Sequence, residues 1–121
     1  MDSKEIRPKK GPEEQIVQRL IPFLKHRDWL IMRTHGNMYQ CGFPDLYITH
    51  YLYGPKWVEV KNLERYSFTN AQMEWFPKML SHGSRIWVLC DATEEEYAKL
   101  FKGSNVMDYM MTKMATMRIR R

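Results

Sequence analysis

The sequence predicts an α/β fold, in which helices flank a mixed central sheet of about four strands. Apolar residues repeat with helical spacing near the N-terminus, and two later Thr-x-x-Gln/Glu patterns are typical of helix starts. Short apolar runs bounded by glycine and proline separate these helical segments and indicate strands. The 121 residues suffice for one domain with a real buried core but not for two domains.

The first helix is expected to begin at Pro12, because proline suits the first helical position. Glu13 and Glu14 follow it and place negative charge where a helix N-terminus favours it. Apolar residues then keep helical spacing as far as Leu24. Pro22 lies inside this helix, where its missing N–H should kink or fray it.

Four segments are predicted to be strands. The first, residues 29–33, begins with a tryptophan and ends at an arginine. The second and third, residues 45–53 and 56–61, are joined at Gly54-Pro55 and most simply form an antiparallel hairpin. The fourth, residues 85–90, is a continuous apolar run of the kind found in strands covered on both faces.

Two capping boxes predict the later helices. Thr69 and Gln72 form the first, which opens a helix that runs to about residue 81. Thr93 and Glu96 form the second, which opens a helix that runs to about residue 102. The predicted order is therefore helix, three strands, helix, strand, helix and a tail.

The net charge of +5 is concentrated in the two ends of the chain, and the part between them is close to neutral. Residues 1–11 are interpreted as a flexible basic arm, 12–103 as the folded domain, and 104–121 as a Met-rich basic segment that packs on the domain or on a dimer interface. Basic ends suit a polyanionic partner such as nucleic acid, and they also suit simple solubility.

Several classes of protein are not expected. No stretch approaches the roughly 20 apolar residues that span a bilayer, so no membrane partner is expected and a cytoplasmic location is predicted. Cys41 and Cys90 lack CxxC spacing and are expected to be reduced thiols. With these cysteines, the four histidines lack the spacing of a zinc site; they are His26, His35, His50 and His82.

Charged residues interrupt the predicted hairpin at two places. Asp45 opens one strand, while Glu59 and Lys61 share one face near the end of the other. Val58 and Val60 then point to the opposite face, into the core. If the strands pair as predicted, Asp45 comes close to Glu59 and Lys61. The simpler interpretation is a solvated salt bridge between Glu59 and Lys61 on an edge strand.

Two converging carboxylates repel each other unless a cation lies between them. Carboxylate oxygens suit Mg²⁺ or Mn²⁺, which acidify a bound water and neutralise charge on a phosphate. Lys61 beside such a site can orient the nucleophile or stabilise charge that develops on the phosphate. The pattern therefore predicts metal-dependent cleavage of a phosphodiester.

Over residues 13–90 the sequence resembles the PD-(D/E)xK nucleases, and in particular their virus-type replication-repair branch, the VRR-NUC domains. Asp45 and Glu59-Val60-Lys61 match the core signature. Further motifs arrive in the family's order, namely Glu14 with Val17-Gln18, Trp29 to Arg33, Gly42-Phe43-Pro44-Asp45-Leu46, and Thr69 with Gln72 and Trp75. One departure is Asn62 to Tyr66, where relatives often carry a shorter polar link, which concerns loop shape rather than chemistry.

The resemblance implies a restriction-endonuclease-like core. It implies catalytic roles for Asp45, Glu59, Lys61, Glu14 and Gln72, and metal ligands from Asp45, Glu59, the Val60 carbonyl and, through water, Glu14. Gln18, Arg33, Lys9 and Lys10 are the predicted DNA contacts. Three of these residues also have simpler explanations. Glu14 can complement the helix dipole, Gln72 can serve the capping box alone, and Arg33 can be a strand-end charge. Trp75 and Trp87 are expected in the core.

The implied activity is that of a Mg²⁺- or Mn²⁺-dependent DNA endonuclease of the phage or bacterial stand-alone type. Its expected substrate is branched DNA, most simply the four-way (Holliday) junction. The alternatives are a flap-directed or restriction-type nuclease, and a non-catalytic DNA-binding module.

Paired cuts in two strands favour a symmetric homodimer, because a single chain carries one set of catalytic residues. Two apolar segments could form its interface. One is Tyr51-Leu52-Tyr53 at the hairpin tip, and the other is a methionine stripe made of Met107, Met110, Met111, Met114 and Met117. The stripe could equally cover its own core, and the hairpin could stack on DNA bases.

Overall fold

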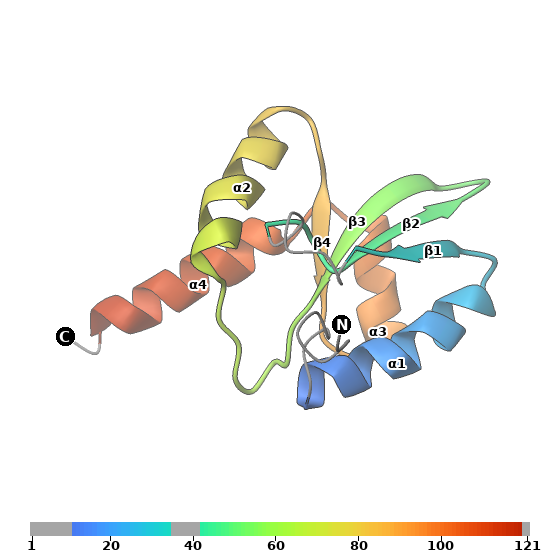
Figure 1. The fold of residues 1–121 in the computed structure, drawn as a ribbon, viewed down its shortest axis with the longest axis horizontal. Helices are drawn as coiled ribbons and strands as arrows, with labels where there is room; N and C mark the ends of the chain where they lie inside the picture. Colours follow the sequence, from blue (N-terminus) through green and yellow to red (C-terminus); the bar gives the residue numbers. More distant parts are fainter. Residues whose placement is uncertain (1–10, 35–41, 120–121) are drawn as a thin grey trace, which may run out of the picture.

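The computed structural model describes residues 11–34 and 42–119, with side chains as far as residue 113. Its elements are α1 (Pro12–Lys25), β1 (Leu30–Arg33), β2 (Leu46–His50), β3 (Gly54–Val60), α2 (Asn70–Ser81), β4 (Ile86–Leu89), α3 (Glu94–Ala98), the 3-10 helix η3 (Lys99–Phe101) and α4 (Val106–Ile119). Figure 1 shows α1 on one side of the sheet and α2 on the other. The predicted α/β class is confirmed, and α4 occupies the segment predicted only as a tail.

The four strands form one mixed sheet in the order β1-β2-β3-β4. The first two pairings are antiparallel and the pairing of β3 with β4 is parallel. The predicted hairpin is confirmed, but its turn lies earlier than expected. His50 pairs with Gly54, so the turn is Tyr51 to Tyr53 and Pro55 belongs to β3. Gly54 adopts φ +76°, a conformation that favours glycine.

A separate hydrophobic core lies on each face of the sheet. The larger core joins α1 and η3 to β2, β3 and β4 through Ile16, Val17, Leu20, Leu24, Trp29, Leu46, Ile48, Val58, Val60, Trp87, Leu89 and Leu100. The smaller core joins α2 and α4 to β4 through Phe76, Ile86, Val88, Cys90, Val106 and Met110. Both faces of β4 are thus covered, as its unbroken apolar run predicts.

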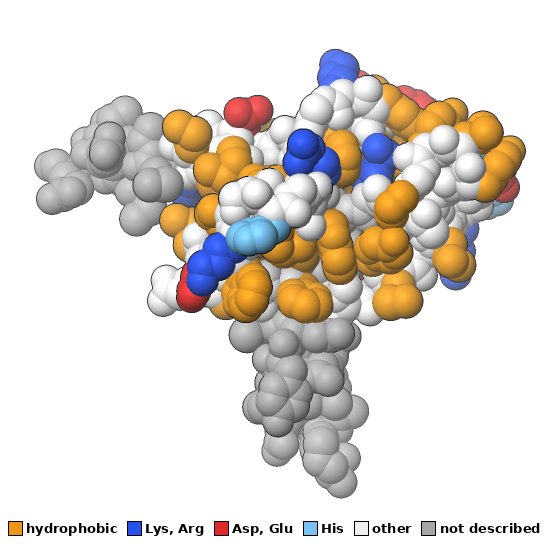
Figure 2. Space-filling model, turned by 90° about the horizontal axis from the view of Figure 1, so that it is seen from above, with side chains coloured by type: hydrophobic (Ala, Val, Ile, Leu, Met, Phe, Trp, Pro, Cys, Tyr) orange, Lys and Arg blue, Asp and Glu red, His pale blue; other side chains and the backbone are white. Residues whose placement is uncertain are grey.

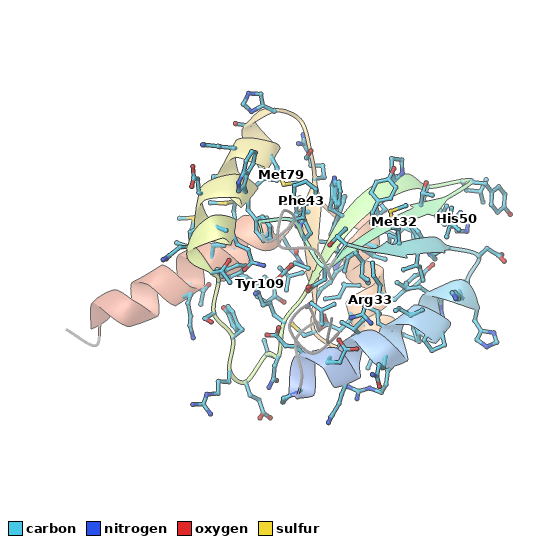
Figure 3. The ribbon with its side chains drawn as sticks, in the orientation of Figure 1. Met32, Arg33, Phe43, His50, Met79 and Tyr109 are labelled. Carbon is cyan, nitrogen blue, oxygen red and sulfur yellow. The ribbon has the colours of Figure 1, made fainter. Side chains whose placement is uncertain are left out.

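The α2 side of the sheet is covered over β4 but not over β1. Leu30 and Met32 project from β1 on that side and are 73% and 63% exposed. Figure 3 labels Met32 there, on the strands away from α1. In the methionine stripe, Met110 is buried against its own domain, while Met107 and Met111 are exposed. Of these three methionines, only Met110 therefore packs in the core. The side chains of Met114 and Met117 lie outside the described residues.

Trp75 is not a core residue, whereas Trp87 is buried as expected. Trp75 is 47% exposed and its indole lies against the backbone of Gly42. A Cβ at position 42 would lie 2.5 Å from Trp75 Cδ1, so a side chain there would force the indole aside. The Gly of the Gly-x-Pro-Asp segment and the Trp of α2 are therefore complementary in shape.

Two helix details differ from the prediction. Helix α1 continues past Pro22 to Lys25, so the expected fraying at the proline is wrong. The helix predicted from Thr93 to about residue 102 is split into α3 and η3. Glu96 Oε1 accepts from the Cys90 N–H (2.7 Å), so this side chain joins the helix start to β4. Among the described residues, no helix has both the length and the apolar character needed to cross a membrane.

Candidate active site

The position of Asp45 is fixed by the pairing of β2 with β3. Leu46 lies opposite Val58 in the register, so the preceding Asp45 comes opposite Glu59. The N–H of Asp45 donates to Glu59 Oε1 (3.1 Å), and the N–H of Val60 donates to Asp45 Oδ2 (2.7 Å). Main-chain donors therefore orient both carboxylates, and both side chains are buried.

Thr34, the residue after β1, holds the backbone of Asp45 from the neighbouring strand. Its N–H and its hydroxyl each donate to the Asp45 carbonyl at 3.0 Å, and the hydroxyl also donates to the Pro44 carbonyl. Sequence reasoning missed this buried threonine, because a threonine after a short strand carries no motif of its own. The start of β2 is thereby tied to the end of β1.

Glu59 and Lys61 lie on the α2 face of the sheet at the end of the central strand β3. Lys61 Nζ is 2.8 Å from Glu59 Oε2, and the two side chains are 4% and 0% exposed. The ammonium also lies 4.6 Å from the ring centroid of Phe68. The interpretation as a solvated salt bridge on an edge strand is therefore wrong, because the strand is internal and the pair is buried.

Gln72 joins the helix start to this ion pair. Its Oε1 accepts from the Thr69 N–H (3.1 Å) and completes the capping box, while Thr69 Oγ1 accepts from the Gln72 N–H (3.0 Å). The same Oε1 accepts from Lys61 Nζ (3.3 Å), and Nε2 donates to Glu59 Oε2 (2.8 Å). One side chain thus satisfies the cap and orients both members of the pair.

Glu14 and Arg33 lie at the edge of this cluster, from α1 and β1. The Arg33 guanidinium donates to both Glu14 oxygens (2.7 and 3.2 Å), and Gln18 Nε2 donates to Oε2 (3.3 Å). The hydrogen bond from Arg33 holds the pKa of Glu14 below its usual value, while the nearby Asp45 charge acts in the opposite direction. Figure 3 labels Arg33 on the side of the sheet that faces α1.

The donor set agrees with the chemistry of a hard divalent cation. Within residues 11–34 and 42–119, no group of three or more His, Cys, Asp or Glu side chains is placed to hold a metal ion. Mg²⁺, however, usually keeps several waters and binds proteins through one or two carboxylates. Asp45 and Glu59 are the two buried carboxylates that could hold such an ion here, and the Val60 carbonyl is the third ligand that the family resemblance implies. Glu14 is engaged by Arg33, and its carboxylate is close enough to Asp45 for the Asp45 charge to act on its pKa.

Comparison with known proteins identifies no relative: no protein-family model, curated protein or solved structure matches this chain. Of the predicted site residues, the structure brings together Asp45, Glu59, Lys61 and Gln72, and it places Glu14, Gln18 and Arg33 beside them. Lys9 and Lys10, the predicted arm contacts, lie outside the described residues, as do His35 and Cys41.

Proposed function

We propose that this protein is a Mg²⁺- or Mn²⁺-dependent DNA endonuclease of the PD-(D/E)xK type, related to the VRR-NUC branch. The observation that carries the proposal is the buried network in which Asp45, Glu59, Lys61 and Gln72 converge from two strands and a helix. Burying three charged groups is costly, so a domain with two ordinary hydrophobic cores gains little stability from such a cluster. A catalytic task explains why the cluster is present.

The order of elements also supports the proposal. A mixed sheet of four strands flanked by helices agrees with the core that the family resemblance implies. Each motif of that resemblance in the described residues has a structural partner. Gly42 packs on Trp75, and Gln72 contacts both Glu59 and Lys61.

The chain's own residues have separable tasks in the proposed hydrolysis. Asp45 and Glu59 present oriented oxygens, since backbone N–H groups hold one oxygen of each. When bound, the divalent ion lowers the pKa of a water and neutralises charge on the phosphate. Lys61 positions that water or stabilises the negative charge that grows on the phosphate oxygens. Gln72 keeps the ammonium beside the carboxylate, and Glu14 offers a further acceptor at the edge of the site.

The proposed substrate is branched DNA, with the four-way junction first, and the proposed active form is a homodimer. The exposed hairpin tip suits an interface between two copies, because Tyr51, Leu52 and Tyr53 are 81%, 67% and 48% exposed. Light scattering at micromolar concentration should give about twice the chain mass if this proposal holds. A Tyr53→Glu variant should shift the protein towards a monomer.

The proposal is tested with labelled duplex, flap, fork and four-way junction DNA in Mg²⁺, Mn²⁺, Ca²⁺ or EDTA. Cleavage should need Mg²⁺ or Mn²⁺ and should stop with EDTA and with Ca²⁺. Asp45→Asn and Glu59→Gln keep the side-chain shapes and should slow cleavage by at least about 10²–10³-fold, the size of one missing electrostatic contribution. Glu95→Gln, the same carboxylate-to-amide change at an exposed position of α3, is the matched control and should cut at the wild-type rate.

Robust cleavage in EDTA would rule out the metal mechanism. Binding of branched DNA with no cleavage under any of these conditions would instead identify the non-catalytic DNA-binding module. Preferential cutting of flaps or of duplex would support the proposed nuclease activity but would show that the four-way junction is not the preferred substrate.

A further inference from the structure

Two shallow grooves open where α2 ends and β4 begins. The first has a volume of about 350 Å³ and is lined by Tyr47, Pro55, Trp57, Gly83, Ser84, Arg85 and Trp87. The second has a volume of about 330 Å³ and is lined by Trp75, Lys78, Met79, His82 and Ser84. Ser84 lines both, so the two hollows are neighbours, and together they are named the Trp57–Trp75 groove. Figure 2 views the molecule from above and shows hydrophobic side chains with a few Lys or Arg side chains among them.

The aromatic rings of the groove are held by their neighbours. The Trp57 ring makes edge contacts with Tyr47 (centroids 5.0 Å apart, 63° between planes) and with Phe43 (6.0 Å, 68°). Trp75 rests on Gly42 and keeps almost half of its surface exposed. Rings that are fixed before a ligand arrives lose little freedom when a flat molecule stacks on them. The groove therefore offers preformed stacking surfaces.

The charge of the groove complements a phosphate backbone. Its charged lining residues are Lys78 and Arg85. Lys78 Nζ lies 5.6 Å from the Trp75 ring centroid and also pairs with the exposed Glu74. Arg85 donates to the Ser84 carbonyl (3.1 Å), and its guanidinium has five N–H donors in all. Aromatic side chains interleaved with cations are the usual composition of sites for single-stranded nucleic acid.

The groove leads towards the candidate active site along β3. Trp57 and Glu59 are two residues apart on the same face of this strand, which is about 7 Å along the chain. We propose that the Trp57–Trp75 groove holds unpaired nucleotides of the DNA substrate, whose bases stack on these two indoles beside the phosphodiester that is cut. The inference rests on the proposed nuclease function. It ranks flap and fork DNA, which have a single-stranded segment at the branch, ahead of the fully paired four-way junction.

Binding in EDTA separates this inference from catalysis. Fluorescence anisotropy should show that the wild-type protein binds a labelled oligothymidine more tightly than a blunt duplex of equal length. Trp75→Leu should weaken oligothymidine binding by about 5- to 150-fold, the range for removing one stacking aromatic, and should change duplex binding much less. Trp75→Phe should restore most of the affinity. Phe101→Leu, which replaces an aromatic side chain that is 47% exposed and outside both linings, is the matched control and should bind like wild type.

Arg85→Ala provides a second test with an exposed residue that packs against no core. It should lower the salt dependence of oligothymidine binding by about 0.7 in the log–log slope, the effect of one phosphate of a single strand that is no longer neutralised. Arg65→Ala, also exposed but outside both linings, should leave that slope unchanged. Circular dichroism of each variant confirms that the comparison is made on folded protein.

Wild-type affinity of both Trp75→Leu and Arg85→Ala for oligothymidine would overturn the inference. So would a loss of dimer mass in Trp75→Leu with binding unchanged, because the groove would then hold a second copy of the chain. If the protein cleaves DNA but its binding does not depend on Trp75, the groove is not the single-strand site and the nuclease proposal stands. Trp75-dependent binding without any cleavage would support the groove as a single-strand site and reject the nuclease.

Discussion

Replacing Lys61 with methionine tests whether a buried ammonium holds the candidate site together. Lys61 Nζ lies 2.8 Å from Glu59 Oε2, and both side chains are almost completely removed from solvent. Methionine keeps the unbranched shape and all but the last atom of the side chain and removes its charge, so Glu59 is left as a buried carboxylate beside Asp45. Breaking one side of a buried ion pair typically costs about 3–5 kcal/mol. At roughly 4 °C per kcal/mol, the melting temperature should fall by about 12–20 °C.

Lys78→Met is the matched control for this substitution. Lys78 pairs with Glu74 at 3.0 Å on the surface of α2, with side chains that are 56% and 63% exposed. A solvated pair of this kind contributes about 0.5 kcal/mol or less. Urea and thermal unfolding, followed by circular dichroism in EDTA, should therefore separate the two variants by several kcal/mol. A Lys61→Met protein within about 1 kcal/mol of wild type would refute the buried pair.

Adding Mn²⁺ to the same proteins tests the metal site through stability alone. An ion that binds the folded state stabilises it by about 2.7 kcal/mol at a hundred times its dissociation constant. The gain should be larger for Lys61→Met than for wild type, because the ion then supplies the missing positive charge beside Glu59. An equal gain in a Glu59→Gln/Lys61→Met double variant would show that Glu59 does not hold the ion.

Three further predictions follow from the charges and the burial. Glu14 has a lowered pKa in the folded state, so its stabilising contribution is present near neutral pH and is lost as the pH falls through that pKa. Arg33→Ala should therefore cost up to about 1 kcal/mol at pH 7 and almost nothing at pH 3, as measured by urea unfolding. Burial raises the pKa of Cys90, so in a Cys41→Ser chain the remaining thiol should react slowly with a disulfide reagent at neutral pH and rapidly after unfolding. Deleting residues 1–10 should lower the log–log salt slope of DNA binding by about 0.9 for each phosphate that the arm neutralises, and an unchanged slope would assign those charges to solubility.

The strand pairing around the site could be predicted because it depends on local patterns. Alternation along residues 56–61 places Glu59 and Lys61 on one face, and a hairpin with its turn after His50 brings Asp45 opposite them. The turn itself was misplaced by a few residues, because Gly54-Pro55 is a strong turn signal even where it begins a strand. The error did not change the partners of the charged residues, since both strands kept their order and direction.

Contacts between distant segments could not be predicted from local patterns. The apolar character of Trp75 predicts a core residue, yet the side chain is almost half exposed and rests on Gly42, a contact that requires glycine at that distant position. Met110 is buried while Met107 and Met111 are not, and a methionine stripe alone does not say which of its members meets the neighbouring sheet. Such outcomes depend on the distance between elements, which spacing along the chain does not encode.

Gln72 makes one contact that local sequence predicts and another that it does not. The capping box accounts for its amide oxygen, and on the sequence alone that explanation is complete. The box uses only one end of the amide, however, so Nε2 must find another acceptor if the side chain is buried. The acceptor is Glu59 Oε2, and the helix start is thereby anchored to the central strand. A residue that caps a helix within three residues of itself can therefore also fix the orientation of a carboxylate that lies 13 residues earlier in the chain.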